Sequence, residues 1–304
     1  MAKNPARSSN KDRVQVAREH AEQQRIATQK AQRRRANLIK AIIAAIVLVV
    51  VAVAVVIIIG LKNKGEDQYA EGPYPKTGNE VGGVLFTGPT EAKATNLTGK
   101  VKRPEGDNPL PSEKVNISGA DKNATPVQVI VYADPACPHC YEFEKSWGPT
   151  LNEQLEAGKI TLEQRMVPYL DRGSPSNYSS RANNMLACVA DSKPEVYNAV
   201  LNELFEVTMS QGEQKNQELI DLAKKHGVDG NIDSCVADGT FRPWVAHADR
   251  QAREDGVSGT PSVFVNGERW DGQKNPDFGG WLQGKIDAAG KDGEAKGSDA
   301  KDDK

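Results

Sequence analysis

The stretch from Val127 to Cys140 reads VQVIVYADPACPHC, so a β-branched apolar run leads straight into two cysteines separated by two residues. The run up to Tyr132 is typical of a strand that is buried on both faces. Four apolar residues then recur at intervals of four, as on one face of a helix: Phe143, Trp147, Leu151 and Leu155. The sequence therefore predicts a strand followed by a helix, with the C-x-x-C motif at their junction.

This placement gives the first sulfur a chemical role. Cys137 would lie at the N-terminus of the helix, where unpaired amides and the helix dipole stabilise an anion. Its pKa should therefore fall below the free value of about 8.5, and a protonated His139 would lower it further. We predict dithiol–disulfide exchange, with Cys137 as the nucleophile that forms a mixed disulfide and Cys140 as the resolving thiol.

Two other interpretations of the motif were weighed. Half of a zinc site would need further ligands at matching spacing, but the chain offers no second C-x-x-C and only the scattered His20, His226 and His247. We therefore predict neither a metal nor a cofactor. An inert structural disulfide is unusual in a turn with proline and histidine, and it stays open as an alternative.

The remaining cysteines, Cys188 and Cys235, fall on separate predicted helical segments, 47 positions apart. An oxidising compartment disfavours free thiols, and closing this loop would stabilise the fold by about 4 kcal/mol in the chain-entropy model. We interpret the pair as a structural disulfide, with a second redox relay as the alternative.

Helical periodicity continues over about 172–255, and strand signals return at Ser262–Val265. The turn Asn266-Gly267 then predicts a hairpin, and a last amphipathic helix is expected at about 277–289. The tail 290–304 has no apolar period and is predicted to be disordered.

The segment 62–125 is rich in Gly, Pro, Asn, Lys and Glu, with one apolar patch at Val81–Phe86. It is interpreted as a spacer that contains a short β-hairpin near Gly82–Gly88.

Residues 1–40 carry eleven basic and three acidic residues, a net charge of +8, although the whole chain carries −2. The 21 residues 41–61 that follow contain no charged or polar side chain. As a helix they would extend roughly 30 Å, the thickness of a bilayer core. They are too long and too far from the N-terminus for a cleaved signal peptide. We predict an uncleaved signal anchor.

The basic flank is expected to stay in the cytoplasm, so everything after the anchor would be extracytoplasmic. The basic segment has almost no aromatic residue and no zinc or helix-turn-helix signature, so nucleic-acid binding is not predicted. The predicted localisation is the cell membrane, with a single span and a cytoplasmic N-terminus.

The strand, Cys137–Cys140 and the helix, followed by a helical insertion and by Gly256–Pro261 before a strand and hairpin, resemble the DsbA family. The resemblance covers about 126–289 and is closest to the membrane-anchored actinobacterial type. It implies an α/β thioredoxin-like fold with an inserted helical subdomain. It also implies that Pro138 and His139 tune the thiol pKa, and that Thr260 and a cis Pro261 bind substrate.

The chain departs from the family pattern in two places. Many relatives have a buried glutamate where this chain has Val131, which leaves Asp134 or water to transfer the proton of the resolving thiol. Threonine at position 260, before the proline, is frequent in isomerases and reductases, whereas several oxidases have valine there.

The resemblance implies unfolded exported polypeptides as substrates and a quinone-linked membrane protein as reoxidant, either DsbB-like or resembling vitamin K epoxide reductase. We expect a monomeric disulfide oxidase. A disulfide isomerase or reductase of the same fold is the main alternative. A non-catalytic anchored chaperone or binding module is a further one.

Overall fold

The computed structural model describes residues 30, 69–106 and 108–299. The chain divides into two units, 1–67 and 68–304, and the second contains the folded domain. The predicted membrane span 41–61 lies outside the described residues, and so does the basic segment 1–40 apart from Lys30. Within the described ranges, no helix combines the length and apolarity that crossing a bilayer requires.

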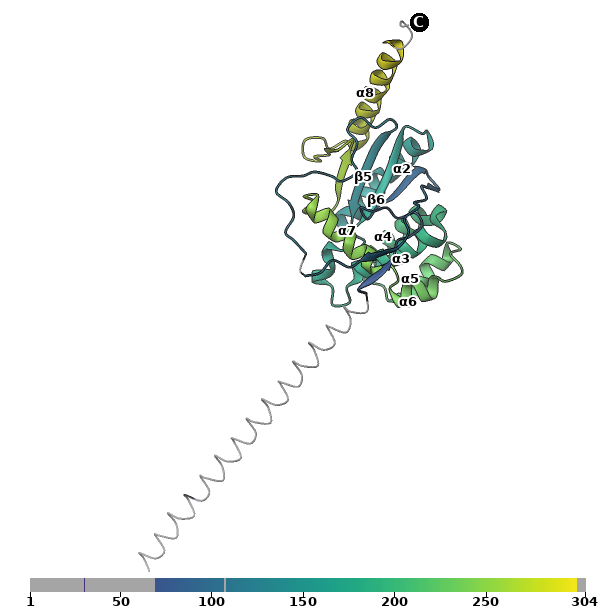
Figure 1. Cartoon of the computed structure of the whole chain (residues 1–304), viewed down its shortest axis with the longest axis vertical. Coiled ribbons are helices and arrows are strands. Elements are labelled where there is room, and N and C mark those ends of the chain that lie inside the picture. Colours follow the sequence, from purple (N-terminus) through teal and green to yellow (C-terminus); the bar gives the residue numbers. More distant parts are fainter. Residues whose placement is uncertain (1–29, 31–68, 107, 300–304) are drawn as a thin grey trace, which may run out of the picture. The chain divides into compact units, whose positions relative to one another are not determined.

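A six-stranded sheet forms the centre of the domain, in the order β3-β2-β6-β5-β7-β8 (Figure 1). The central strand β5 runs parallel to β6 and antiparallel to β7. The strands of this sheet are β2 (Val84–Gly88), β3 (Glu91–Ala92), β5 (Val127–Ala133), β6 (Ile160–Met166), β7 (Ser262–Val265) and β8 (Glu268–Arg269). The buried run predicted as a strand is thus the central strand, and the predicted hairpin is β7–β8.

Alternate residues of β5 face two different cores. Val129 and Val131 pack with the helix α2 (Pro138–Glu156) and with the start of α8 (Phe278–Asp299). Ile130 belongs to the second core, on the face covered by α7 (Arg242–Glu254). Both faces of the strand are therefore buried, as its apolar sequence predicts.

The segment between β6 and β7 is helical, as predicted, and gathers at the end of the sheet opposite α8 (Figure 1). It comprises η1 (Tyr169–Gly173), α3 (Tyr178–Ser192), η2 (Pro194–Val196), α4 (Tyr197–Gln211), α5 (Asn216–Lys225), α6 (Ile232–Asp238) and α7. The thioredoxin-like α/β fold with a helical insertion is confirmed.

In the described part of 62–125, the predicted short hairpin is present as β2–β3, but the prediction that the segment is a spacer is wrong. The strand β2 pairs with β6 in the main sheet and forms a short hairpin with β3. Two further strands, β1 (Glu71–Pro73) and β4 (Lys100–Lys102), pair with each other and lie on α7. These strands have two to five residues each, and an apolar pattern cannot be recognised over so short a length.

The segment 108–118, here called the strap, connects this part to the thioredoxin core.

The C-terminal prediction also needs correction, because α8 extends to Asp299 rather than ending near residue 289. The residues 290–299 lack an apolar period and include three glycines, so their composition does not account for the helical continuation.

Candidate active site

Cys137 is the N-cap residue of α2, directly after the turn that follows β5, and Pro138 occupies the first helical turn. Proline is suited to this position, because its missing N–H would have no partner in a helix. Cys140 is the third residue of the helix and is buried, with 2% of its surface exposed, while Cys137 is 5% exposed. Both are free thiols in this structure. Pro138 and His139 lie between them and are exposed to solvent.

The surroundings of Cys137 lower its pKa to about 5. The largest contribution is the hydrogen bond from the Cys140 thiol, followed by the Thr260 side chain and by the backbone amides of Cys140 and His139. Burial alone would act in the opposite direction. Burial and the neighbouring Cys137 sulfur raise the pKa of Cys140. The two thiols therefore differ strongly in acidity, with the thiolate placed on Cys137.

The loop 256–261 reaches this pair from the far end of the helical insertion. The peptide bond between Thr260 and Pro261 is cis. In its thiol form, the Sγ of Cys137 donates a hydrogen bond to the carbonyl oxygen of Thr260 at 3.4 Å. The structure therefore brings Thr260 and Pro261, predicted as substrate-binding residues, next to the predicted nucleophile.

Asp134, proposed above for proton transfer, is completely buried at the start of the turn 134–137 between β5 and α2, here called the catalytic turn. Its carboxylate accepts hydrogen bonds from the backbone N–H groups of Ala136 and Leu170, at 2.8 and 2.9 Å. The hydroxyl of Ser179 donates a third, at 2.6 Å. Burial outweighs these donors and raises its pKa to about 6. The carboxylate thus ties the catalytic turn to η1 and α3.

A buried ionic network holds the other side of the site, and no local sequence pattern predicts it. Arg165, 1% exposed, forms ion pairs with Glu163 at 2.8 Å and with Asp255 at 3.5 Å. The hydroxyl of Tyr132 donates to the second carboxylate at 2.8 Å. Asp255 directly precedes the loop 256–261, so the network fixes the base of that loop.

Tyr169 is a second residue that sequence reasoning missed. Its hydroxyl donates to the carbonyl oxygen of Val257, within the loop, at 2.7 Å. The guanidinium of Arg253 lies 4.5 Å from the centre of its ring. Its partners are more than 80 positions away in the chain, so no local pattern could have indicated the contact.

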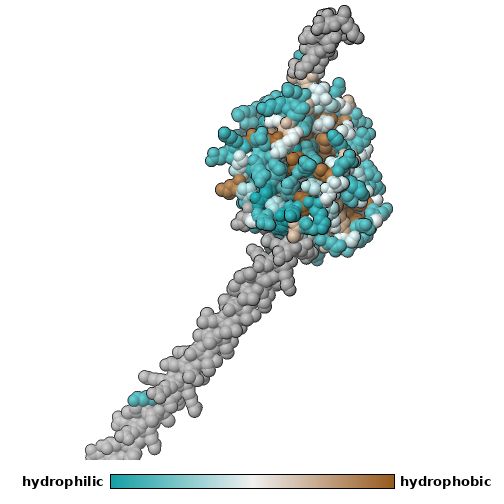
Figure 2. Space-filling view, viewed as in Figure 1, coloured by the Kyte–Doolittle hydropathy of each residue, from teal (hydrophilic) through white to brown (hydrophobic). Residues whose placement is uncertain are grey.

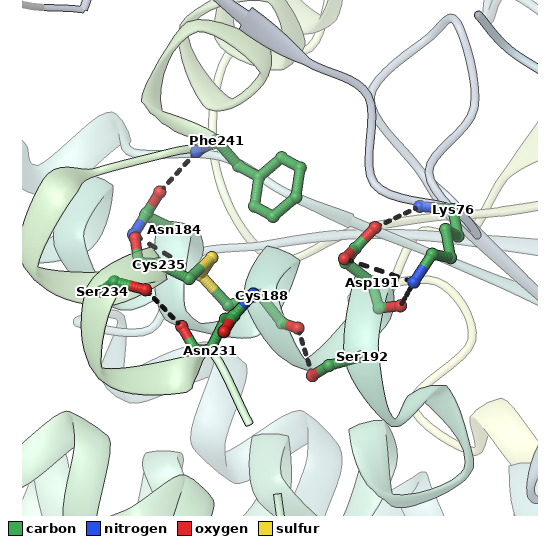
Figure 3. The surroundings of a disulfide bond; sticks show 9 residues. All are labelled: Lys76, Asn184, Cys188, Asp191, Ser192, Asn231, Ser234, Cys235 and Phe241. Carbon is green, nitrogen blue, oxygen red and sulfur yellow. Dashed lines mark hydrogen bonds and ion pairs between the residues drawn. A yellow bond between two sulfur atoms is a disulfide. The ribbon is translucent and has the colours of Figure 1, made fainter. Parts of the chain in front are cut away.

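Cys188 and Cys235 form a disulfide, with an S–S distance of 2.03 Å, which joins α3 to α6 (Figure 3). Asn184 braces the joint by donating to the Cys235 carbonyl at 3.2 Å. Its side-chain oxygen accepts from the N–H of Phe241 at 2.8 Å. The disulfide thus lies in the helical insertion rather than beside Cys137.

Within the described residues, no group of three or more His, Cys, Asp or Glu side chains is arranged to hold a metal ion.

The chain is similar to several known proteins. The family described as thioredoxin matches residues 119–283. Reduced DsbG from Mycobacterium tuberculosis is 32% identical, with 53% of this chain and 78% of that chain covered and a TM-score of 0.44. Oxidised DsbA from the same organism is 30% identical, with 59% and 90% covered and a TM-score of 0.48.

MdbA, a thiol–disulfide oxidoreductase from Actinomyces oris, is 20% identical, with 71% of this chain and 92% of that chain covered and a TM-score of 0.52. At that identity the likeness is one of fold. No curated protein matches the chain.

Proposed function

Because the chain belongs to the thioredoxin family and is a thiol–disulfide oxidoreductase of the DsbA type, we propose that it works as a disulfide oxidase. In this role the Cys137–Cys140 disulfide is donated to polypeptides that carry reduced cysteines. Pro138 and His139 tune the thiol pKa, and Thr260 and Pro261 bind the substrate backbone.

The observation that carries the oxidase role is the position of Cys137 at the N-terminus of α2, where the Cys140 thiol and backbone amides donate hydrogen bonds to its sulfur and lower its pKa to about 5. A stabilised thiolate stabilises the reduced enzyme, so its disulfide becomes a better oxidant. At pH 7 the gain in reduction potential depends only on the difference between that pKa and the solution pH, because a free thiol is protonated at this pH. Two pKa units over that interval correspond to roughly 60 mV for a two-electron couple.

The exchange proceeds in two steps that balance in atoms and electrons. A substrate thiolate attacks the Sγ of Cys137, the Cys137–Cys140 bond breaks, and Cys140 leaves and takes up a proton. A second substrate thiolate then attacks the substrate sulfur of the mixed disulfide. The substrate disulfide forms, and Cys137 leaves as the stabilised thiolate. The substrate loses two electrons and the enzyme gains them.

The proposal extends to the location of the reaction. The apolar segment 41–61 would anchor the chain with its N-terminus in the cytoplasm, and the domain would act on exported polypeptides outside the membrane. A quinone-linked membrane protein, DsbB-like or resembling vitamin K epoxide reductase, would reoxidise Cys137 and Cys140. Asp134 is a candidate for proton transfer to the resolving thiol, and the chain is proposed to be a monomer.

The test is the reduction potential of the full chain, equilibrated in glutathione buffers, with the thiols trapped by alkylation. We expect a potential well above that of the glutathione couple, and no titration in a Cys137→Ser variant. A second assay measures how fast the oxidised chain forms disulfides in a reduced, unfolded protein.

A strongly reducing potential would assign the chain as a reductase. Efficient reshuffling of a scrambled protein that persists in Cys140→Ser would assign it as an isomerase. Binding of unfolded protein that is retained in a variant without Cys137 and Cys140 would indicate a non-catalytic chaperone.

A further inference from the structure

The large apolar side chains that are most exposed in the described part of the chain are Leu110, Val115 and Leu170. Their exposed fractions are 88%, 46% and 39%. The first two lie on the strap and the third lies on η1. In the view of Figure 2, most of the visible surface of the folded domain is hydrophilic, with brown apolar atoms in small separate patches.

The strap lies against the residues that lead into the loop 256–261. The N–H of Ser112 donates to the carbonyl oxygen of Arg253, and the N–H of Asn116 to that of Asp255, both at 2.9 Å. The approach at Gly256 is so close that a side chain there would meet the backbone oxygen of Lys114 at 2.7 Å. Val115 is therefore held directly beside the first residue of this loop.

The 3₁₀ helix η1 flanks the same loop through Tyr169, whose hydroxyl binds Val257 and whose ring lies under Arg253. The next residue, Leu170, donates its backbone N–H to Asp134 in the catalytic turn. Its side chain is thus exposed between the loop and the turn that carries Cys137.

These positions are fixed by buried polar contacts. The hydroxyl of Ser118, at the end of the strap, donates to Asp255 at 2.6 Å. Its carbonyl oxygen accepts from Arg165 at 2.8 Å. Because Arg165 and Asp255 are themselves buried, these bonds hold the C-terminal end of the strap against the base of the loop. The same loop ends at Thr260, whose carbonyl oxygen contacts the sulfur of Cys137.

We propose that Leu110, Val115 and Leu170 form a docking surface, called the apolar border, for the apolar side chains that flank the cysteine of a reduced, unfolded polypeptide. Val115 lies beside the first residue of the loop that ends near Cys137, and Leu170 is bonded to the turn that precedes Cys137, so both flank the site. This inference rests on the proposed function and deepens it, because it assigns part of substrate recognition to the strap, which precedes the thioredoxin core.

The size of the apolar border favours this occupant over a second copy of the chain. Three separated side chains with backbone between them are far smaller than the roughly 1,200–2,000 Å² that a stable protein interface buries. An extended polypeptide needs to bury less surface area, because it contacts a surface with a few alternate side chains while its backbone pairs with a loop. Selection by apolar contact also suits a substrate that is exposed only while it is unfolded.

The experiment uses the full chain with Leu110→Ser, Val115→Ser and Leu170→Ser, singly and together. The substrate is a reduced, unfolded protein, and dithiothreitol serves as a small dithiol that is too small to reach the apolar border. We expect KM for the protein to rise roughly threefold in each single variant and at least tenfold in the triple variant. The rate with dithiothreitol and the reduction potential should stay unchanged.

The matched control is Ile286→Ser, which also replaces a partly exposed apolar residue. Its neighbours on α8, Lys285 and Ala288, line a cavity with Thr125 and Asn266, at the end of β5 remote from Cys137. This variant should oxidise the unfolded protein with the KM of the unaltered chain.

A second comparison uses two synthetic peptides, each with one cysteine flanked by leucine or by serine. The unaltered chain should react faster with the leucine peptide, and the triple variant should lose that preference.

An unchanged KM and an unchanged peptide preference in the triple variant would overturn the apolar border while leaving the oxidase role intact. A monomer–dimer equilibrium abolished by the triple variant would overturn it in favour of a second copy as occupant. Failure of the unaltered chain to oxidise dithiothreitol would instead remove the proposed function itself.

Discussion

The acidity of Cys137 is set by donors that can be removed one at a time. The Cys140 thiol contributes most to the lowered pKa, and the Thr260 side chain follows. Both surround a sulfur that is almost completely buried, where a hydrogen bond to an anion is worth about 1.5–3 kcal/mol.

Replacing these donors should therefore raise the pKa of Cys137 in a defined order. We expect Cys140→Ala to raise it most and Thr260→Val to raise it by about one unit, since one unit corresponds to 1.36 kcal/mol. The ultraviolet absorbance of the thiolate as a function of pH measures this pKa. Thr260→Ser keeps the hydroxyl and is the control. An equal pKa in the valine and serine variants would rule out the hydroxyl as a donor.

Asp134 should make the stability of the domain depend on pH. Its pKa is about 6 in the folded protein, raised by burial, against about 3.9 in an unfolded chain. The folded state therefore binds the proton more tightly, and the stabilisation is present below pH 4 and lost as the pH rises through 6. The difference of about two units corresponds to roughly 3 kcal/mol.

Asp134→Asn should remove this dependence. As the pH falls from 7 to 4, the free energy of unfolding of the unaltered chain should therefore increase relative to that of the variant. Urea titrations across that range measure the difference. A constant difference between the two proteins would show that the carboxyl does not titrate as argued.

Among the helices, the joint between α3 and α6 depends on a single covalent link and on Asn184. Its loop spans 47 positions, for which the chain-entropy model gives about 4 kcal/mol as an upper value. We expect the Cys188→Ala, Cys235→Ala double variant to lose most of that stability. Its reduction potential should be unchanged, because the disulfide lies in the helical insertion. A shifted potential would instead support a second redox relay.

The strand β2 makes the N-terminal segment an integral part of the sheet. Phe86 on this strand is completely buried, and its ring centre lies 5.5 Å from that of Tyr197. Phe86→Ala should therefore cost about 3–5 kcal/mol, the usual range for removing a buried aromatic ring. Leu110→Ala, on the exposed part of the strap, is the control and should leave the free energy of unfolding unchanged. Equal denaturation midpoints for the Phe86 variant and the unaltered chain would restore the interpretation as a spacer.

Across the domain, local patterns were predictable and long-range contacts were not. The strand Val127–Tyr132, the cysteine pair and the Asn266-Gly267 turn each form a signal within a few residues. The ionic contact between Arg165 and Asp255 joins residues 90 positions apart, and neither residue is unusual in its local sequence. The bond from Ser179 to Asp134 spans 45 positions, so its role in the catalytic turn was equally hidden.

The buried network around Arg165 connects the strap, the sheet and α7. Arg165→Met would leave Glu163 and Asp255 as buried carboxylates without a cation, which should cost about 3–5 kcal/mol. The exposed pair Lys224–Asp233 provides the control, and Lys224→Met should change stability by less than about 1 kcal/mol. Denaturant unfolding measures both variants, and equal losses would contradict the assignment of the network as a buried structural tie.

The contact between Cys137 and Thr260 spans 123 positions, which has a consequence for biosynthesis. A ribosome releases the N-terminus first, so a growing chain that has emerged as far as residue 240 already presents all four cysteines, but still lacks Thr260, one of the groups that lower the pKa of Cys137. Four thiols can pair in three ways, and at that stage no folded site selects among them. The enzyme therefore cannot direct the oxidation of its own cysteines during synthesis. The correct pairing of the cysteines requires that the C-terminal strands have been synthesised.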